Sequence, residues 1–182
     1  MTSMAPMIRA FLLCCAVLTA TPATAEVVAS GVHGFEVRQI VQVVIPQPAA
    51  YDAFTQVPRW WNPEHSYSGD AANLSLALTP GGCFCEKLPG GGGVEHLRLS
   101  HVAPGERLVL TGALGPLLYE AVAGVMDVKV ERIAGGARVT LNYRAAGFAN
   151  GGAAKLAPLV DQVLGDQMAR YRKFAATLPR TR

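Results

Sequence analysis

Charged residues are scarce in this 182-residue sequence, at 16% of the chain against 51% hydrophobic residues. A disordered chain has the opposite balance, so that class is excluded. The net charge is only +3 and no strongly basic segment stands out, which argues against a nucleic-acid-binding protein. Beyond the N-terminus, no apolar run approaches the ~18 residues of a membrane span. We therefore expect neither a nucleic-acid partner nor stable membrane insertion.

The sequence also lacks the short motifs of common cofactor and hydrolytic chemistry. It contains no GxGxxG, Walker A, GxSxG or HExxH pattern. Its run of four glycines, Gly90–Gly93, follows Pro89 and precedes neither a Lys-Ser/Thr pair nor a helix. The run is therefore interpreted as a hairpin turn rather than a phosphate-binding loop, and no cofactor is expected.

The first 25 residues have the organisation of a cleaved export signal. Arg9 precedes an apolar run from Ala10 to Ala20, and the sequence Ala23-Thr24-Ala25 ends in small residues. The apolar run is too short to anchor the chain in a membrane. We predict cleavage after Ala25, a single domain over 26–182, and a periplasmic or secreted location.

Only four cysteines are present, and the predicted cleavage leaves Cys83 and Cys85. Residues two apart in a strand have Cα atoms about 6.5 Å apart, whereas a disulfide prefers about 5.5–6 Å. A disulfide is compatible with this spacing, but two thiols are favoured. The Cys-x-Cys spacing is shorter than that of zinc ligands, so no metal site is expected.

Hydrophobic periodicity predicts an α+β protein made largely of antiparallel strands. Met126, Val128 and Val130 alternate with polar residues, which is typical of a sheet with one buried face. A long amphipathic helix, with apolar residues every three or four positions, closes the chain. The predicted strands are 35–45, 74–79, 83–88, 94–102, 107–111, 121–133 and 137–145; short helices are predicted at 48–56 and from 58, and the long helix at 156–174.

This order of elements resembles the helix-grip fold of the START-like (SRPBCC) superfamily, in particular its polyketide cyclase/dehydrase and Hsp90-ATPase-activator-like proteins. The resemblance lies in Arg59-Trp60-Trp61, the turn and strand 80–86 (PGGCFCE), the hairpin 101–110 (HVAPGERLVL) and the final helix, and covers residues 35–177. It implies a curved seven-stranded sheet wrapped around the last helix. It also implies a deep cavity, which the superfamily uses to bind lipids, hormones or polyketides and sometimes to catalyse.

The hairpin formed by 83–88 and 94–102 carries the candidate polar site. If Leu88 pairs with Val94, then Glu86 lies opposite His96 and Phe84 lies opposite Arg98. The resemblance implies that Phe84 points inward, which takes Glu86, His96 and Arg98 into the cavity. The alternative is a register shift by one residue, which exposes this polar trio and buries the cysteines.

The trio has two functional interpretations. It can orient the polar group of a bound ligand, or Glu86 and His96 can act as an acid–base pair. Of the two tryptophans, one is expected at the cavity mouth with Tyr67, and the other in the core. The other candidate ligand-contacting residues are Met126, Tyr143, Val163, Met168 and Tyr171.

Binding of a small hydrophobic molecule is the preferred function. The alternatives are a cyclase- or hydrolase-like enzyme that uses Glu86 and His96, and an interaction module whose cavity is filled by side chains. A homodimer is compatible with the sequence.

Overall fold

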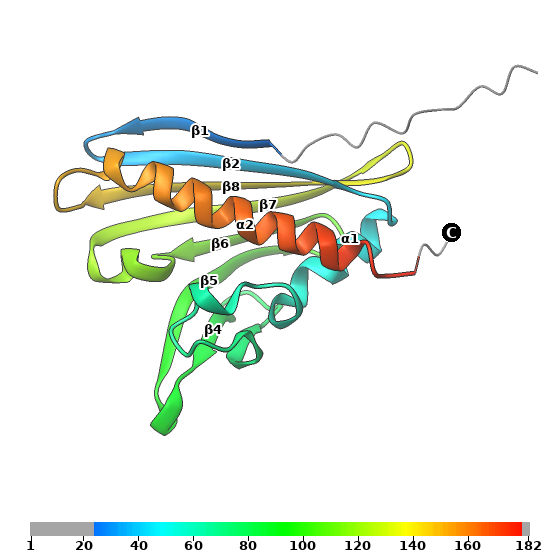
Figure 1. Cartoon of the computed structure of the whole chain (residues 1–182), viewed down its shortest axis with the longest axis horizontal. Helices are drawn as coiled ribbons and strands as arrows, with labels where there is room; N and C mark the ends of the chain where they lie inside the picture. The colour runs from blue at the N-terminus through cyan, green and yellow to red at the C-terminus, as the bar shows by residue number, and fades with distance from the viewer. Residues whose placement is uncertain (1–23, 180–182) are drawn as a thin grey trace, which may run out of the picture.

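One continuous antiparallel sheet curves around a long helix (Figure 1). The coordinates are a computed structural model, and they describe residues 24–179. The strand order across the sheet is β1-β2-β8-β7-β6-β5-β4-β3. The strands are β1 (Thr24–Gly31), β2 (Gly34–Val43), β3 (Leu74–Leu76), β4 (Cys83–Lys87), β5 (Gly93–Ala103), β6 (Arg107–Gly112), β7 (Ala121–Ile133) and β8 (Gly136–Phe148).

Two α-helices accompany the sheet, α1 (Gln47–Thr55) and α2 (Ala157–Ala175). Six short 3-10 turns complete the described residues: η1 (Val57–Arg59), η2 (Pro63–His65), η3 (Ala71–Asn73), η4 (Pro89–Gly91), η5 (Gly115–Tyr119) and η6 (Ala153–Lys155). The α+β class and the final helix are confirmed. The helix predicted at 48–56 is α1, whereas the second predicted helix is the single turn η1. Both follow β2 in the chain rather than the first strand.

The sheet has eight strands rather than seven, because β1 was not predicted. It pairs along the free edge of β2, with Val27 opposite Val37. Its described side chains are exposed, so its sequence carries no alternation of buried and exposed positions to identify it. Most of the predicted leader lies in residues 1–23, outside the described residues, whereas Thr24 and Ala25 belong to β1.

The core lies between the concave face of the sheet and α2. The inward positions of β2 and β8, such as Val37 and Val139, are fully buried. The apolar stripe of α2 covers them through Leu164, Met168 and Tyr171, as its three- and four-residue spacing predicts. Tyr171 also donates a hydrogen bond to the Ala50 carbonyl at 2.9 Å, which ties α2 to α1.

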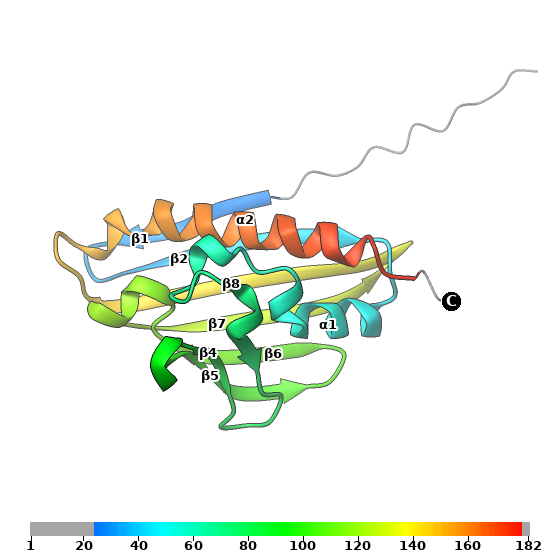
Figure 2. The same cartoon turned by 60° about the horizontal axis from the view of Figure 1, so that its bottom comes forward.

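The loops between α1 and β4 close one side of this core. Figure 2 shows the segment 57–73 between α2 and the β4–β5 end of the sheet. Two hydrogen bonds hold it to the helix: the Asn62 amide donates to Asp166 at 2.9 Å, and the Asn62 backbone N–H donates to Gln167 at 2.8 Å. This segment therefore sits over the strands that carry the candidate site.

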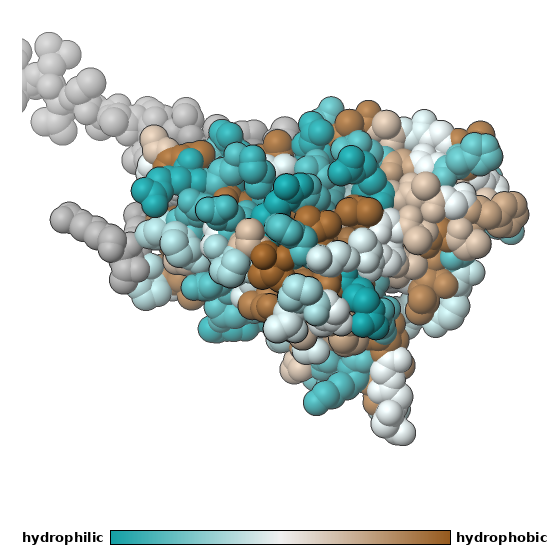
Figure 3. All heavy atoms as spheres, turned by 180° about the vertical axis from the view of Figure 1, so that it is seen from behind, coloured by the Kyte–Doolittle hydropathy of each residue, from teal (hydrophilic) through white to brown (hydrophobic). Residues whose placement is uncertain are grey.

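The opposite face of the sheet is uncovered. Seen from behind, hydrophilic residues occupy much of it, with apolar residues in the middle and toward one end, and the glycine-rich β4–β5 turn projects from the body (Figure 3). Within residues 24–179, no helix has the length and apolar character needed to cross a membrane.

Candidate functional site

A β-bulge in the β4–β5 hairpin determines which side chains face the interior. Phe84 pairs with Leu97, but the next residue, Cys85, pairs with Glu95, so His96 is an extra residue on β5. A bulge of this kind re-aims the side chains of the strand that carries it. His96 and Leu97 are both buried as a result, 4% and 1% exposed.

Two members of the predicted trio face the interior, and the third does not. Glu86 and His96 face the interior as expected. Arg98 does not: its side chain is 54% exposed on the outer face, where it pairs with Glu95. The predicted pairing of Leu88 with Val94 is wrong, because Val94 pairs with Glu86 and Arg98 pairs with Cys83. The prediction also assumed an unbroken register, in which alternate residues of β5 share a face. The extra residue shifts that alternation between His96 and Arg98.

Glu86 and His96 form a buried, hydrogen-bonded dyad. The His96 Nε2 atom lies 2.9 Å from Glu86 Oε2, and the two side chains are 4% and 0% exposed. The backbone N–H groups of Tyr67 and Ser68 also donate to the carboxylate. Burial by itself raises the pKa of the Glu86 carboxyl, but the hydrogen bonds from Ser68, Tyr67 and His96 outweigh it and hold the pKa below its ordinary value.

This network fixes the role of each imidazole nitrogen. An ionised carboxylate only accepts hydrogen bonds, so the proton of His96 must be on Nε2. The Nδ1 atom is buried and has no hydrogen-bond partner within residues 24–179. A neutral His96 therefore presents Nδ1 as an acceptor, and a protonated one presents it as a donor. The ring is held between Phe84 and Tyr67, at centroid distances of 5.0 and 5.8 Å.

His96 lies in the wall of a mainly apolar pocket of about 350 Å³. That volume is within the ordinary range for small-molecule sites. Besides His96 on β5, three parts of the chain form the walls: the 61–67 loop, the segment around η5, and the first two turns of α2 with the residue before it. The lining residues are Trp61, Glu64, His65, Ser66, Tyr67, His96, Leu114, Gly115, Pro116, Leu117, Leu156, Leu159, Val160, Val163 and Leu164.

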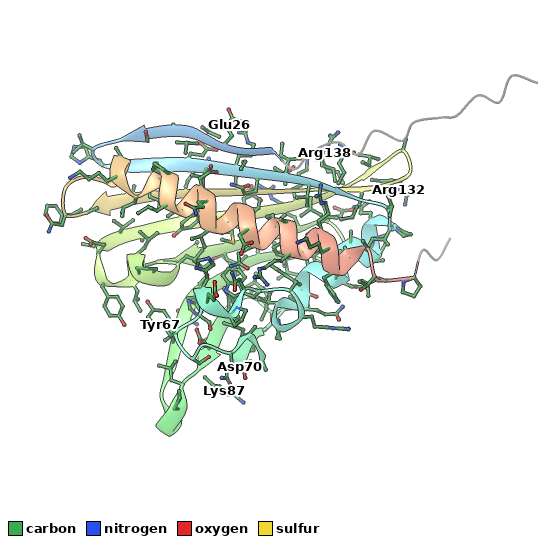
Figure 4. The ribbon with its side chains drawn as sticks, in the orientation of Figure 1. Glu26, Tyr67, Asp70, Lys87, Arg132 and Arg138 are labelled. Carbon is green, nitrogen blue, oxygen red and sulfur yellow. A yellow bond between two sulfur atoms is a disulfide. The ribbon has the colours of Figure 1, made fainter. Side chains whose placement is uncertain are left out.

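The aromatic residues divide as expected between pocket and core. Trp60 is 5% exposed, donates to the Phe54 carbonyl at 3.1 Å and packs among core rings. Trp61 lines the pocket and lies edge-on to Phe84 at 5.2 Å. Tyr67 lies at the pocket mouth on the side of η5 (Figure 4), and its hydroxyl donates to the Gly115 carbonyl at 2.9 Å.

A second, deeper cavity of about 20 Å³ lies behind Trp61 and Leu164, which line both spaces. Phe84, Met126 and Met168 line it, so these predicted residues lie at the inner end of the site. The one polar side chain in its wall is that of Gln167, whose Nε2 atom is buried without a hydrogen-bond partner. The interior is thus nearly filled at its deep end and open near the mouth, which argues against a wholly filled cavity.

Two of the predicted ligand-contacting residues lie outside both cavities. Tyr143 and Tyr171 line neither cavity; both are fully buried core residues whose hydroxyls donate to backbone carbonyls. Periodicity correctly placed them on inward faces, but it does not distinguish a core position from a cavity wall. Val163, in contrast, lines the pocket as predicted.

The η5 segment is the main part of the pocket that the sequence analysis did not identify. Leu114 and Leu117 are buried, while Pro116 lines the opening. The signal was present, because 112–119 is an apolar stretch within a predicted loop. An apolar loop needs a surface to cover, and here it covers the end of the sheet beside Tyr67.

The cysteines also differ from the expectation. Cys83 and Cys85 are joined by a disulfide with a Cα–Cα distance of 5.3 Å, shorter than the spacing assumed for a regular strand. Their sulfur atoms and a Glu95 oxygen lie within 4.8 Å of one another. That grouping would suit a metal ion only with free thiols, and here the two sulfurs are bonded to each other.

Comparison with known proteins supports the fold alone. No protein-family profile matches the sequence, and no curated protein is similar to it. Among solved structures, an uncharacterized protein from Rhizobium leguminosarum matches with a TM-score of 0.59 and 18% identity, over 85% of this chain and 98% of that one.

Two other structural neighbours have the same architecture. CalU16 from Micromonospora echinospora matches with a TM-score of 0.55 and 11% identity, over 86% of this chain and 85% of its own. DynU16, from the dynemicin biosynthetic locus, matches with a TM-score of 0.55 and 17% identity, over 78% of this chain but only 47% of its own. At these identities the similarity extends to the α+β architecture and not to the activity.

Proposed function

We propose that this protein binds a small, mainly hydrophobic molecule that carries one polar group. The observation that carries the proposal is the buried, unpartnered Nδ1 atom of His96, a residue that lines an apolar pocket of about 350 Å³. A buried polar atom without a partner costs about 1–3 kcal/mol. A ligand hydroxyl that donates to Nδ1 removes that cost, while the surrounding apolar side chains bury the rest of the molecule.

The family, the class of ligand and the location of the protein are further parts of this proposal. The fold and the predicted family resemblance favour a place beside the polyketide cyclase-like members of the START-like superfamily, with a lipid-, polyketide- or aromatic-like ligand. The leader-like sequence favours export to the periplasm or beyond. Adaptable Met126 and Met168 at the deep end would accommodate ligands of different shape.

A matched pair of bicyclic probes tests the polar contact. 1-Naphthol and naphthalene differ by one hydroxyl, so their affinity ratio reports a hydrogen bond to His96. We expect 1-naphthol to bind about five-fold more tightly, as one hydrogen bond of about 1 kcal/mol implies. His96→Phe should remove that preference while naphthalene still binds. His101→Phe is the control, because His101 is exposed on the same strand.

Native mass spectrometry of the purified protein gives an independent measurement. A co-purifying lipid-like or polyketide-like mass supports binding in the pocket. Equal affinity for the two probes in the unaltered protein contradicts the role of His96. Failure of both probes to bind, with no thermal shift across a panel of lipids, sterols and polyketides, contradicts the binding function itself.

The dyad also favours a second candidate, an acid–base enzyme acting in the same pocket. A carboxylate that fixes the tautomer of a histidine leaves the other ring nitrogen available as a general base. In this role His96 Nδ1 removes a proton from a carbon next to a carbonyl group, while Glu86 stabilises the imidazolium. Deuterium exchange into 2-tetralone measures that step. If the protein accelerates deuterium exchange and His96→Phe abolishes the acceleration, the result supports catalysis. If exchange is no faster than in buffer, the result contradicts catalysis and favours binding.

A further inference from the structure

The disulfide between Cys83 and Cys85 lies outside the pocket. Phe84 and Glu86 alternate with the cysteines and point inward, so both sulfur atoms lie on the outer face of β4. Both cysteines are partly exposed. No described helix covers this face of the sheet (Figures 1 and 2). A thiol in solution therefore has access to the bond.

This bond contributes little to holding the fold together. The two cysteines are only two positions apart, and a disulfide restricts the unfolded chain less as the loop it closes becomes shorter. The strand is already held on both sides, by β3 and β5. A disulfide that is accessible and not needed to hold the fold is available for chemical exchange.

Charged neighbours make the two sulfur atoms unequal. Arg98 lies directly opposite Cys83 across the β4–β5 pair, and Glu95 lies opposite Cys85. The Arg98 guanidinium is held in place by Glu95 and by the Gly81 carbonyl at 2.8 Å. The Glu95 carboxylate lies within 4.8 Å of both sulfur atoms, so it does not distinguish them. A cation beside a sulfur stabilises its thiolate. The difference therefore rests on Arg98, whose place opposite Cys83 favours Cys83 as the leaving group. Lys87, farther along the same face of β4, adds positive charge near the end of the strand (Figure 4).

We propose that the Cys83–Cys85 disulfide is a thiol–disulfide exchange site that oxidises dithiols. A substrate thiolate attacks Sγ of Cys85, the Sγ–Sγ bond breaks, and the electron pair leaves on Sγ of Cys83. The second thiolate of the substrate then attacks the substrate sulfur of the mixed disulfide. The bond to Cys85 breaks, and Cys85 leaves as a thiolate. The substrate loses two electrons and becomes a disulfide. Cys83 and Cys85 gain those electrons and take up the two protons that the substrate releases.

Reaction of the full chain with a reduced two-cysteine peptide tests the activity. We expect one peptide disulfide to form for each protein molecule. Alkylation should then label both cysteines in the tryptic peptide 60–87, which excludes the cysteines near the N-terminus. Dithiothreitol is the second substrate and distinguishes a general dithiol site from one that needs a polypeptide. Cys83→Ser and Cys85→Ser should each abolish peptide oxidation.

Two arginine variants test the direction of attack. Arg98→Ala should slow exchange about three-fold, because the leaving thiolate loses its neighbouring cation. Arg107→Ala is the matched control: this arginine also lies on the outer face, but on β6 and paired with Asp127 at 2.7 Å. It should leave the rate unchanged. A disulfide that neither dithiol reduces overturns the proposal, as does peptide oxidation that persists in both serine variants.

Discussion

Replacing Glu86 with glutamine tests whether the dyad is a buried charged network. In the native protein, Oε2 accepts hydrogen bonds from the Tyr67 N–H at 3.1 Å and from His96 at 2.9 Å, while Oε1 accepts from the Ser68 N–H. A glutamine has one oxygen and one NH₂ group. In either orientation the NH₂ group faces at least one backbone N–H, so two donors oppose each other in a buried space.

The expected cost follows from the buried donor that the glutamine leaves without an acceptor. Such a group costs about 1–3 kcal/mol, and more where the lost acceptor is charged. For a domain of this size, a loss of about 3 kcal/mol lowers Tm by about 6–12 °C. Urea unfolding at pH 7 measures the difference in the free energy of unfolding. Glu95→Gln is the control, because that carboxylate is 44% exposed and its loss should cost less than about 1 kcal/mol.

The pH dependence of the difference provides the stricter test. The folded-state pKa of Glu86 is lowered, so its contribution to stability is complete above the ordinary carboxyl value of about 4.3. It is lost as the pH falls through the folded value. The difference in the free energy of unfolding between Glu86→Gln and the unaltered protein should therefore become smaller in strong acid. A difference in the free energy of unfolding below 1 kcal/mol at pH 7, or one that does not change with pH, would refute the claim that Glu86 is ionised in this network.

Two further predictions come from the structure, and a third comes from the leader-like sequence. Trp61→Ala should join the pocket to the deep cavity behind it, which raises the affinity for ligands longer than naphthol and lowers stability. Isothermal titration with probes of increasing length measures the change in affinity, and an unchanged size preference contradicts the prediction. Asp161→Asn should raise Tm at pH 7 but not at pH 3. Burial raises the pKa of Asp161, despite hydrogen bonds from Gln39 and the Glu26 backbone, so its charge costs stability as the pH rises; a Tm difference independent of pH contradicts this. Exported protein should have the intact mass of a chain that begins at Glu26, and a full-length mass contradicts the predicted cleavage after Ala25.

Local pattern was enough to predict most of the fold. The alternation in β7 and β8 and the stripe on α2 each depend on residues close in the chain, and each element formed where its pattern indicated. The same reasoning placed Glu86 and His96 on the inward side of one hairpin. That prediction held although the strands pair differently from the predicted register: Glu86 pairs with Val94, two residues before His96, so Glu86 and His96 both stay inward and the alternation shifts only at the bulge at His96.

The tertiary structure decided what local pattern could not. A single extra residue on β5 turned Arg98 outward, and no change in composition signals such a bulge. Trp60 lies in the core and Trp61 lines the pocket because the Trp60 ring contacts Tyr171 and the Trp61 ring contacts Phe84. Both partners are far away in the sequence. The exposed edge strand β1 forms by backbone pairing, which leaves no side-chain alternation. The sequence thus determined which faces were apolar, whereas the packing of distant segments determined where a pocket was left open beside His96.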